Sequence, residues 1–138
     1  MNTSKEIAKL IDACLDDERM LEHESRFVSP ERARVLRVLA AERGRFIDEL
    51  RGVGGIRDTR EHGSWRELGR ELSRDLRVAL GLGNGGDAIA ACRRSCKRTE
   101  ARFERALDLP WPTPSRAVIE GQHARIHATR DELSAVEF

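Results

Sequence analysis

The stretch EIAKLIDACLDDERMLEHESRFVSPERARVLRVLAAERGRFIDEL, residues 6–50, decides the fold because it contains two amphipathic segments and the short link between them. Apolar residues recur in both halves with the 3.6-residue period of an α-helix. They are Ile7, Leu10, Ile11, Cys14, Leu15 and Leu21 in the first half, and Val35, Leu36, Leu39, Phe46, Ile47 and Leu50 in the second. A link of so few residues predicts that the two helices are antiparallel neighbours.

Capping residues mark the ends of these two helices. Thr3 followed by Glu6 has the spacing of a capping box, which predicts a first helix over residues 3–25. Residues 29–31 (SPE) combine an N-cap serine, a proline at the first helical position and an acid in the first turn. They predict a second helix over residues 30–51.

The middle of the chain interrupts the long helices. Residues 52–63 are rich in glycine and charge, which is typical of a loop. Ser64 is expected to cap a shorter helix with its own apolar stripe. The run GLGNGG (81–86) is expected to end that helix, and it lacks the Lys-Ser/Thr ending of a phosphate-binding loop.

The C-terminal part repeats the pattern of a helical hairpin. Asp87 is expected to cap a helix over residues 87–108. The segment LPWPTP (109–114) excludes helix and predicts a stiff turn before a last helix over residues 114–136. Trp111 lies between two prolines, where we expect it to plug the end of the bundle rather than to serve as an exposed recognition residue.

The elements together predict an all-α fold in a single domain over residues 1–138. Two hairpins joined by one long connection that contains a short extra helix are the ferritin-like arrangement of a four-helix bundle. An up-down bundle of five helices is the alternative that the pattern leaves open.

Composition narrows the classes of function. The chain has 25 basic and 24 acidic residues, so its balanced charge disfavours a nucleic-acid partner. No apolar run reaches the ~20 residues of a membrane span, so no membrane partner is expected. No secretory segment is visible at the N-terminus, which makes the cytoplasm the expected compartment and reduced thiols the expected state of the three cysteines.

Several stretches resemble a bacterial ferritin-like family known as domain of unknown function 2383. The resemblance covers nearly the whole chain, including Gly63-Ser64 and the late Gln122 and Asp131. Its main matching stretches are KLIDACLDDE (9–18), RVLAAERGRFIDEL (37–50), GNGGDAIAACRRS (83–95) and ERALDLPWP (104–112). The resemblance implies a four-helix bundle, and ferritin-like bundles often hold two metal ions.

A ferritin-like di-metal site takes a Glu from each of two helices and a Glu-x-x-His from each of the other two. Glu18 and Glu42 are the candidate carboxylates of this chain, but Arg45 follows Glu42 at the position of the histidine. On the next helix, Arg93 and Cys96 stand where a carboxylate is expected. We therefore predict that Glu18 or Glu42 forms an ion pair with Arg43 or another arginine instead of binding metal.

A second metal candidate lies on the last helix. Glu120 and His123 form the helical Glu-x-x-His of the chain, and His127 follows one turn later. Three such residues can bind a transition metal. The apolar residues Ile119 and Ile126 define a different face, so we interpret this stripe as solvated and expect no ion on it.

The three cysteines, Cys14, Cys92 and Cys96, are expected to be unpaired core residues, because they lie on apolar helical stripes and form no CxxC motif. A redox pair or thiolate cluster is the alternative. The overall interpretation is a bundle without a cofactor that acts as an interaction or structural protein, with an unidentified protein or a second copy as its partner. The alternative is a metal-binding or oxidoreductase bundle that holds iron or manganese through Glu18 and Glu42.

Overall fold

The computed structural model describes residues 1–54 and 85–135. They form α1 (Thr3–Glu24), the 3-10 turn η1 (Ser25–Phe27), α2 (Pro30–Gly54), α4 (Gly85–Leu107) and α5 (Thr113–Ala135). The all-α prediction is confirmed, because the described residues contain four long helices and no strand. Within these ranges, no helix is both long enough and apolar enough to cross a bilayer.

The first hairpin is capped almost as its sequence predicts. The side chain of Asn2, not that of Thr3, caps α1, because Asn2 Oδ1 accepts a hydrogen bond from the Lys5 amide at 3.1 Å. The predicted capping box at Thr3 is therefore wrong by one residue, and the reason is that Asn is as good an N-cap as Thr. The predicted cap of α2 is confirmed, since Ser29 Oγ accepts from the Arg32 amide at 3.4 Å.

The start of α4 differs from the prediction. The helix begins at Gly85, so Asp87 lies inside it rather than at its cap. The glycines of the first turn lower helix propensity, but the amphipathic face that follows outweighs this cost once it packs on the bundle. The predicted loop over 52–63 is wrong for its first three residues, which extend α2 to Gly54, and its remainder lies outside the described residues, as does the predicted helix that begins at Ser64.

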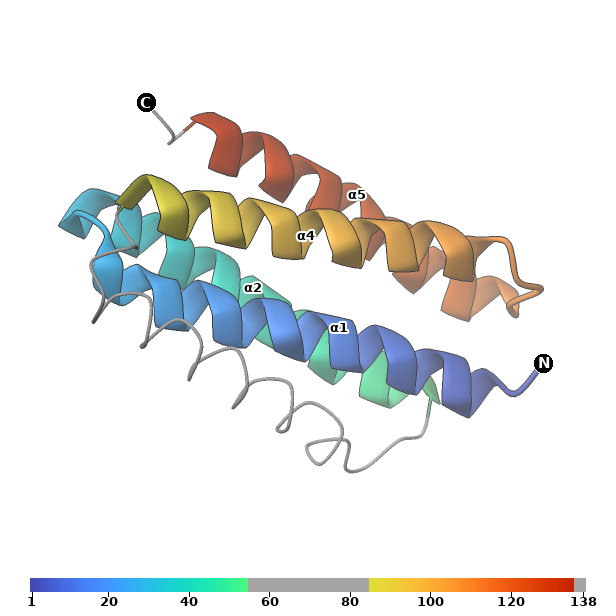
Figure 1. Ribbon diagram of the computed structural model, residues 1–138. Helices are drawn as coiled ribbons and strands as arrows, with labels where there is room; N and C mark the ends of the chain where they lie inside the picture. The colour runs from blue at the N-terminus through green and yellow to red at the C-terminus, as the bar shows by residue number, and fades with distance from the viewer. Residues whose placement is uncertain (55–84, 136–138) are drawn as a thin grey trace.

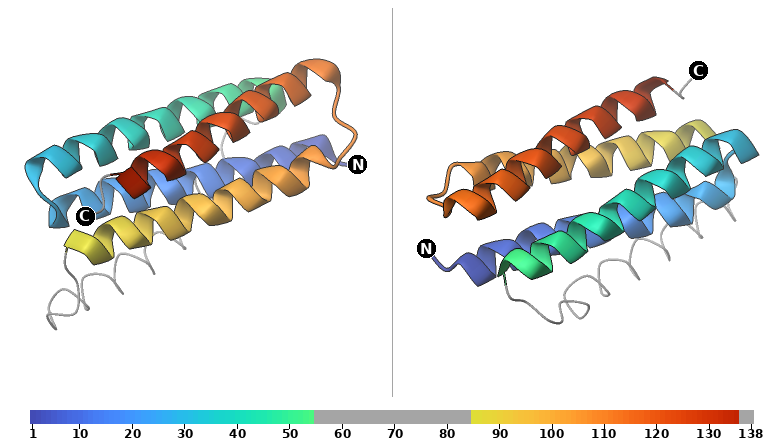
Figure 2. Two further views of the ribbon diagram at one scale, coloured as in Figure 1. Left: turned by 90° about the horizontal axis from the view of Figure 1, so that it is seen from above. Right: turned by 180° about the vertical axis from the view of Figure 1, so that it is seen from behind.

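The four helices form a bundle of two antiparallel hairpins (Figures 1 and 2). Helix α1 packs against α2 and α4, and α5 packs against α4 and, over a smaller area, against α2. In Figure 1, α2 ends at the end of the bundle where α5 begins, whereas α4 begins at the opposite end, beside η1. Helices α2 and α4 therefore run in the same direction along the bundle.

The LPWPTP turn closes one end of the bundle. Trp111 is buried, and its indole Nε1 donates a hydrogen bond to the carbonyl oxygen of Ala106 at 2.6 Å. Arg116 reaches back from α5 and donates to the carbonyls of Leu107 and Leu109 at 3.0 and 2.6 Å. These bonds satisfy the carbonyls of Ala106 and Leu107 in the last turn of α4 and that of Leu109 in the turn that follows. The predicted role of Trp111 as an end plug is confirmed.

The core consists of two apolar clusters with polar residues between them. The Phe103 cluster lies toward the LPWPTP turn, and the Leu36 cluster lies toward η1. The Phe103 cluster contains Ile7, Leu10, Ile11, Cys14, Leu15, Phe46, Ile47, Leu50, Phe103, Ala106, Trp111, Ile119 and Ile126. The Leu36 cluster contains Leu21, Leu36, Leu39, Ala40, Ile89, Cys92, Cys96 and Leu133. Burial of both clusters is the main favourable contribution to folding.

Candidate functional site

A buried polar layer separates the two clusters, and it consists of Asp17, Arg43, Ser95 and Thr99. Arg43 Nε donates to Asp17 Oδ2 at 3.1 Å, and both side chains are fully buried. Asp17 Oδ1 accepts from Ser95 Oγ at 2.5 Å and from Thr99 Oγ1 at 2.9 Å. One carboxylate thus joins α1, α2 and α4. Buried charges are tolerated when they are paired and hydrogen-bonded in this way.

Arg43 is the largest fully buried side chain among the described residues. Its Nη2 lies 3.6 Å from Cys96 Sγ, its Nη1 lies 3.6 Å from Glu42 Oε1, and its guanidinium carbon lies 5.5 Å from the centre of the Phe46 ring. Burial by itself lowers the pKa of Arg43, but Asp17, together with smaller contributions from Cys96 and Cys14, outweighs burial, so that the pKa is raised. Arg43 is therefore a permanent positive charge in the middle of the bundle.

The thiols around this layer are protonated. Burial raises the pKa of Cys96 to about 12, with Asp17 adding to the rise and Arg43 opposing it. Burial also raises the pKa of Cys14 far above its usual range. None of Cys14, Cys92 and Cys96 forms a disulfide, and all three are buried, which confirms the prediction that they are core residues outside any disulfide. A thiol with a raised pKa is a poor nucleophile and a poor metal ligand, because the thiolate is the reactive form.

Glu42 forms the ion pair that the sequence favoured. Its Oε2 atom lies 3.0 Å from Nε and 2.9 Å from Nη2 of Arg125, so the pair joins α2 to α5. Its Oε1 atom accepts a hydrogen bond from Thr129 Oγ1 at 3.5 Å and also faces Arg43. Two arginines thus surround this candidate metal ligand.

Glu18 lies in the contact between α1 and α2. A Cβ atom added at Gly44 would lie 2.7 Å from Glu18 Oε2, so the carboxylate rests against a position where α2 carries no side chain. The adjacent Asp17 has no exposed surface, and Asp12, Asp16 and Glu24 of the same helix are buried too. The sequence pattern placed Glu18 on the inward stripe and missed Asp17. Both residues lie at the edge of the apolar stripe, where the helical period does not decide which of two neighbours is buried.

These residues do not fit the di-metal centre that a ferritin-like fold implies. Such a centre needs several carboxylates and imidazoles around two ions. Here Arg43 already neutralises Asp17, and the neighbouring groups are two hydroxyls and a protonated thiol. A cation in this layer would meet the fixed charge of Arg43 in a medium where repulsion is weakly screened.

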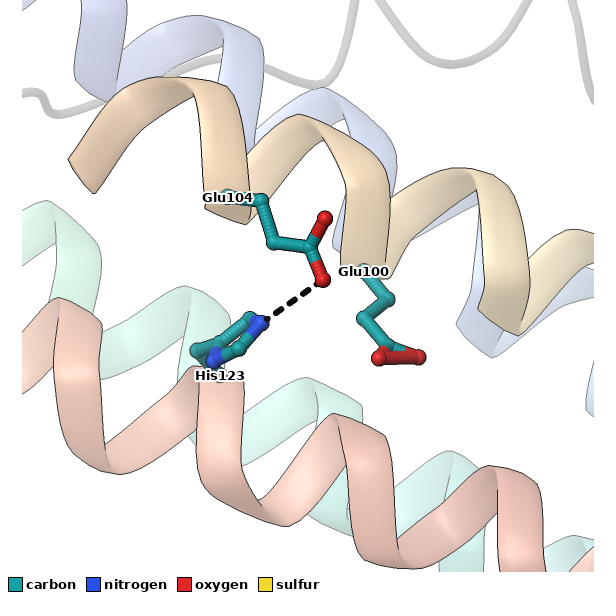
Figure 3. Close-up of side chains that lie close together, drawn as sticks. All are labelled: Glu100, Glu104 and His123. Atoms are coloured by element: carbon teal, nitrogen blue, oxygen red, sulfur yellow. Dashed lines mark hydrogen bonds and ion pairs between the residues drawn. The ribbon is translucent and has the colours of Figure 1, made fainter. Parts of the chain in front are cut away.

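A second group of titratable residues lies between α4 and α5. We call it the α4–α5 seam, and it consists of Glu100, Glu104, His123, His127 and Arg130. Figure 3 shows Glu100 and Glu104 reaching from α4 toward His123 of α5. His123 Nε2 lies 3.5 Å from Glu104 Oε1, and His127 Nδ1 lies 3.0 Å from Glu100 Oε2. Arg130 Nη1 lies 3.2 Å from Glu100 Oε1.

The seam combines His123 with acids that the sequence pattern did not assign to it. Glu120, the predicted partner of His123, instead lies 3.8 Å from Arg116 and is largely exposed. Glu100 and Glu104 are one helical turn apart on α4, and His123 and His127 are one turn apart on α5. Only the register between the two helices brings them together, and a spacing rule within one helix cannot show that register.

Comparisons of this chain with protein-family models, with curated proteins and with solved structures found no significant match.

Proposed function

We propose that this chain is a ferritin-like bundle of the type of domain of unknown function 2383 whose central layer is an ion pair, and that it acts as a structural or protein-interaction domain. The direction of its helices supports the ferritin-like topology. Helices α2 and α4 run the same way, as they do in a bundle with two hairpins and one long crossover. The stretches that resemble the family also support the proposal, because they occur in the chain in the same order as in the family.

The observation that carries the proposal is the buried pair of Arg43 and Asp17. A ferritin-like oxidoreductase holds its metal ions in the bundle core with inward-facing carboxylates and histidines, whereas the core of this bundle contains the pair of Arg43 and Asp17. With a guanidinium there, the central residues hold the helices in register instead of holding a cofactor. A polar group of this kind can specify one arrangement of a core at the expense of some stability.

A groove beside η1 and the start of α2 supports the interaction role. It has a volume of about 650 Å³, and its lining includes Val28, Pro30 and Val38 together with Arg26, Arg34 and Arg37. Val38 is 62% exposed, which makes it, with Met1, one of two large apolar side chains that are exposed among the described residues. Val28 and Pro30 line the same groove, so Val38 belongs to a small apolar patch with a polar rim, and such patches mark interaction sites.

The charge of the groove selects the kind of partner. Three arginines around Val38 create a positive rim, and complementary charge guides association and fixes orientation. The groove therefore fits an acidic protein segment that presents an aliphatic side chain to Val38. A helix with leucines on one face and glutamates beside them has this chemistry.

The test uses a fluorescent amphipathic peptide of leucine and glutamate and the full chain. We expect binding in a fluorescence anisotropy titration, weaker binding at high salt, and loss of binding in the Arg37→Glu and Val38→Asp variants. Arg45→Glu is the matched control, because it changes the same charge on an exposed position of the same helix outside the groove. If Arg45→Glu and Arg37→Glu weakened peptide binding equally, the effect would be one of net charge, and the groove would not be the docking site.

A further inference from the structure

The α4–α5 seam differs from an ordinary surface ion-pair network because its partners are imidazoles as well as a guanidinium. Glu100, Glu104 and His123 each offer one ligand atom, and these atoms all lie within 4.8 Å of one another. The three residues come from two helices that are packed along their length. Their backbones are therefore held in place before any ligand arrives.

The spacing of the ligand atoms suits a small divalent cation. Nitrogen and oxygen ligands lie about 2.0–2.2 Å from zinc, so two ligands of a tetrahedral site are about 3.3 Å apart. Glu104 Oε1 and His123 Nε2 are already 3.5 Å apart. The Glu100 oxygen lies within 4.8 Å of both of these atoms.

Glu100 is the fixed residue of the seam, because its side chain is buried and held by neighbouring residues. Its side chain is only 7% exposed, whereas His123 is 26% and Glu104 59% exposed. Arg130 and His127 hold the two oxygens of Glu100 from the solvent side. Such hydrogen-bonded partners orient a ligand and tune the affinity of a metal site. The partly exposed Glu104 and His123 leave a path for the ion.

We infer that Glu100, Glu104 and His123 bind one borderline divalent transition-metal ion, of the class of Zn²⁺ or Co²⁺, on the outside of the bundle. The carboxylates of Glu100 and Glu104 offset the charge of the ion, with Arg130 beside Glu100 as the remaining cation, and the imidazole selects a transition metal over Mg²⁺ or Ca²⁺. Three protein ligands leave a fourth position for water. His127 is a positioning residue, because it contacts Glu100 rather than the ion.

The inference goes beyond the proposed function and does not depend on it, since the central layer and the groove contain none of these residues. The site also differs from the Glu120–His123 pair of the sequence pattern, because it uses the acids of α4. Glu120→Gln and Glu104→Gln remove the same charge at similarly exposed positions within reach of the seam. They form a matched pair that separates the two assignments.

The test is isothermal titration of untagged, metal-depleted protein with Zn²⁺, followed by visible absorption spectroscopy of the Co²⁺ form. We expect one ion per chain and a cobalt spectrum of low coordination number. His123→Ala and Glu104→Gln should abolish both signals, Glu120→Gln should leave them unchanged, and His127→Ala should weaken binding about 10- to 100-fold, as expected for an outer partner.

Thermal unfolding by circular dichroism confirms that each variant is folded in the absence of metal. Binding that survives Glu104→Gln and disappears in Glu120→Gln would overturn the assignment in favour of a site within α5. The absence of saturable binding by the wild-type protein would overturn the inference altogether. Neither result alters the expectation for peptide binding at the groove.

Discussion

The polar layer and the α4–α5 seam both place acids between packed helices, but they satisfy those acids differently. In the layer, Asp17 is paired with the guanidinium of Arg43, which is fully buried and stays charged. In the seam, Glu104 meets His123, and Glu100 meets both His127 and Arg130, so imidazoles, which can themselves bind metal, supply part of the pairing. The count of acids is therefore a poor guide to metal binding, and the partner of each acid is a better one.

Burial sharpens the same contrast. The layer is buried and lies between two apolar clusters, so any change in its charge is costly. The seam opens to solvent on one side, so its ion pairs contribute little to stability and can be exchanged for an ion. Mutations in the layer should consequently affect folding, and mutations in the seam should affect binding.

The largest effect is expected for Arg43→Met, which leaves the carboxylate of Asp17 buried without its partner. We expect the free energy of unfolding to fall by about 3–5 kcal/mol, as for other broken buried pairs. Urea unfolding followed by circular dichroism measures it. Arg45→Met is the control, because Arg45 is an exposed residue of the same helix, and it should change stability by no more than about 0.5 kcal/mol.

A second substitution distinguishes an unpaired charge from lost packing. Asp17→Asn in the Arg43→Met background keeps an acceptor for Ser95 and Thr99 but removes the charge. We expect this double variant to be more stable than Arg43→Met alone. A further loss of stability would mean that Arg43 matters for its packing on Phe46 rather than for its pairing with Asp17.

An effect of intermediate size is expected at alkaline pH. Burial raises the pKa of Cys96 in the folded chain to about 12, while the same thiol in the unfolded chain has the ordinary value of 9.0. The stability that depends on this proton is complete below pH 9 and is lost as the pH rises toward 12. The loss is about 1.4 kcal/mol for each pH unit above 9, and Cys14 adds to it in the same direction.

Urea unfolding at pH 8, 9 and 10 in a reducing buffer measures this loss. A Cys14→Ala and Cys96→Ala double variant is the reference, because all other groups titrate in both proteins. We expect a shallower fall of stability with pH in the double variant. Parallel pH curves for the two proteins would show that these thiols ionise as easily in the folded chain as in the unfolded one.

The smallest effect is expected for the pair of Glu42 and Arg125. Arg125 is about half exposed, so the coupling energy in a double-mutant cycle of Glu42→Gln and Arg125→Met should be about 0–1 kcal/mol. It should also decrease with added salt. A coupling of several kcal/mol that salt does not reduce would place this pair with the buried layer instead of with the surface.

The sequence was sufficient to locate the four described helices to within a few residues, but not to predict the contacts between them. The 3.6-residue period identified the apolar faces of α1 and α2, and the prolines around Trp111 located the last turn. The period does not say which helices face each other. It left open whether Arg43 pairs with Glu18, Glu42 or a residue of another helix.

The seam shows the same limit at a second place. The Glu-x-x-His spacing drew attention to His123 but assigned it to Glu120 of its own helix. The turn that contains Trp111 sets the register between α4 and α5, and this register puts Glu100 and Glu104 opposite the histidines. Side-chain pairing across two helices depends on such tertiary geometry rather than on local spacing.

The most direct test of the central claim, that the interior of the bundle holds an ion pair instead of a di-metal centre, is the metal content of the protein after anaerobic loading. Untagged chain is loaded with Fe²⁺, Mn²⁺ or Zn²⁺, passed through a desalting column and analysed by mass spectrometry of the elements. We expect at most one ion per chain, lost in Glu104→Gln and unchanged in Glu18→Gln. Two ions of iron or manganese per chain that disappear in Glu18→Gln and persist in Glu104→Gln would contradict the claim.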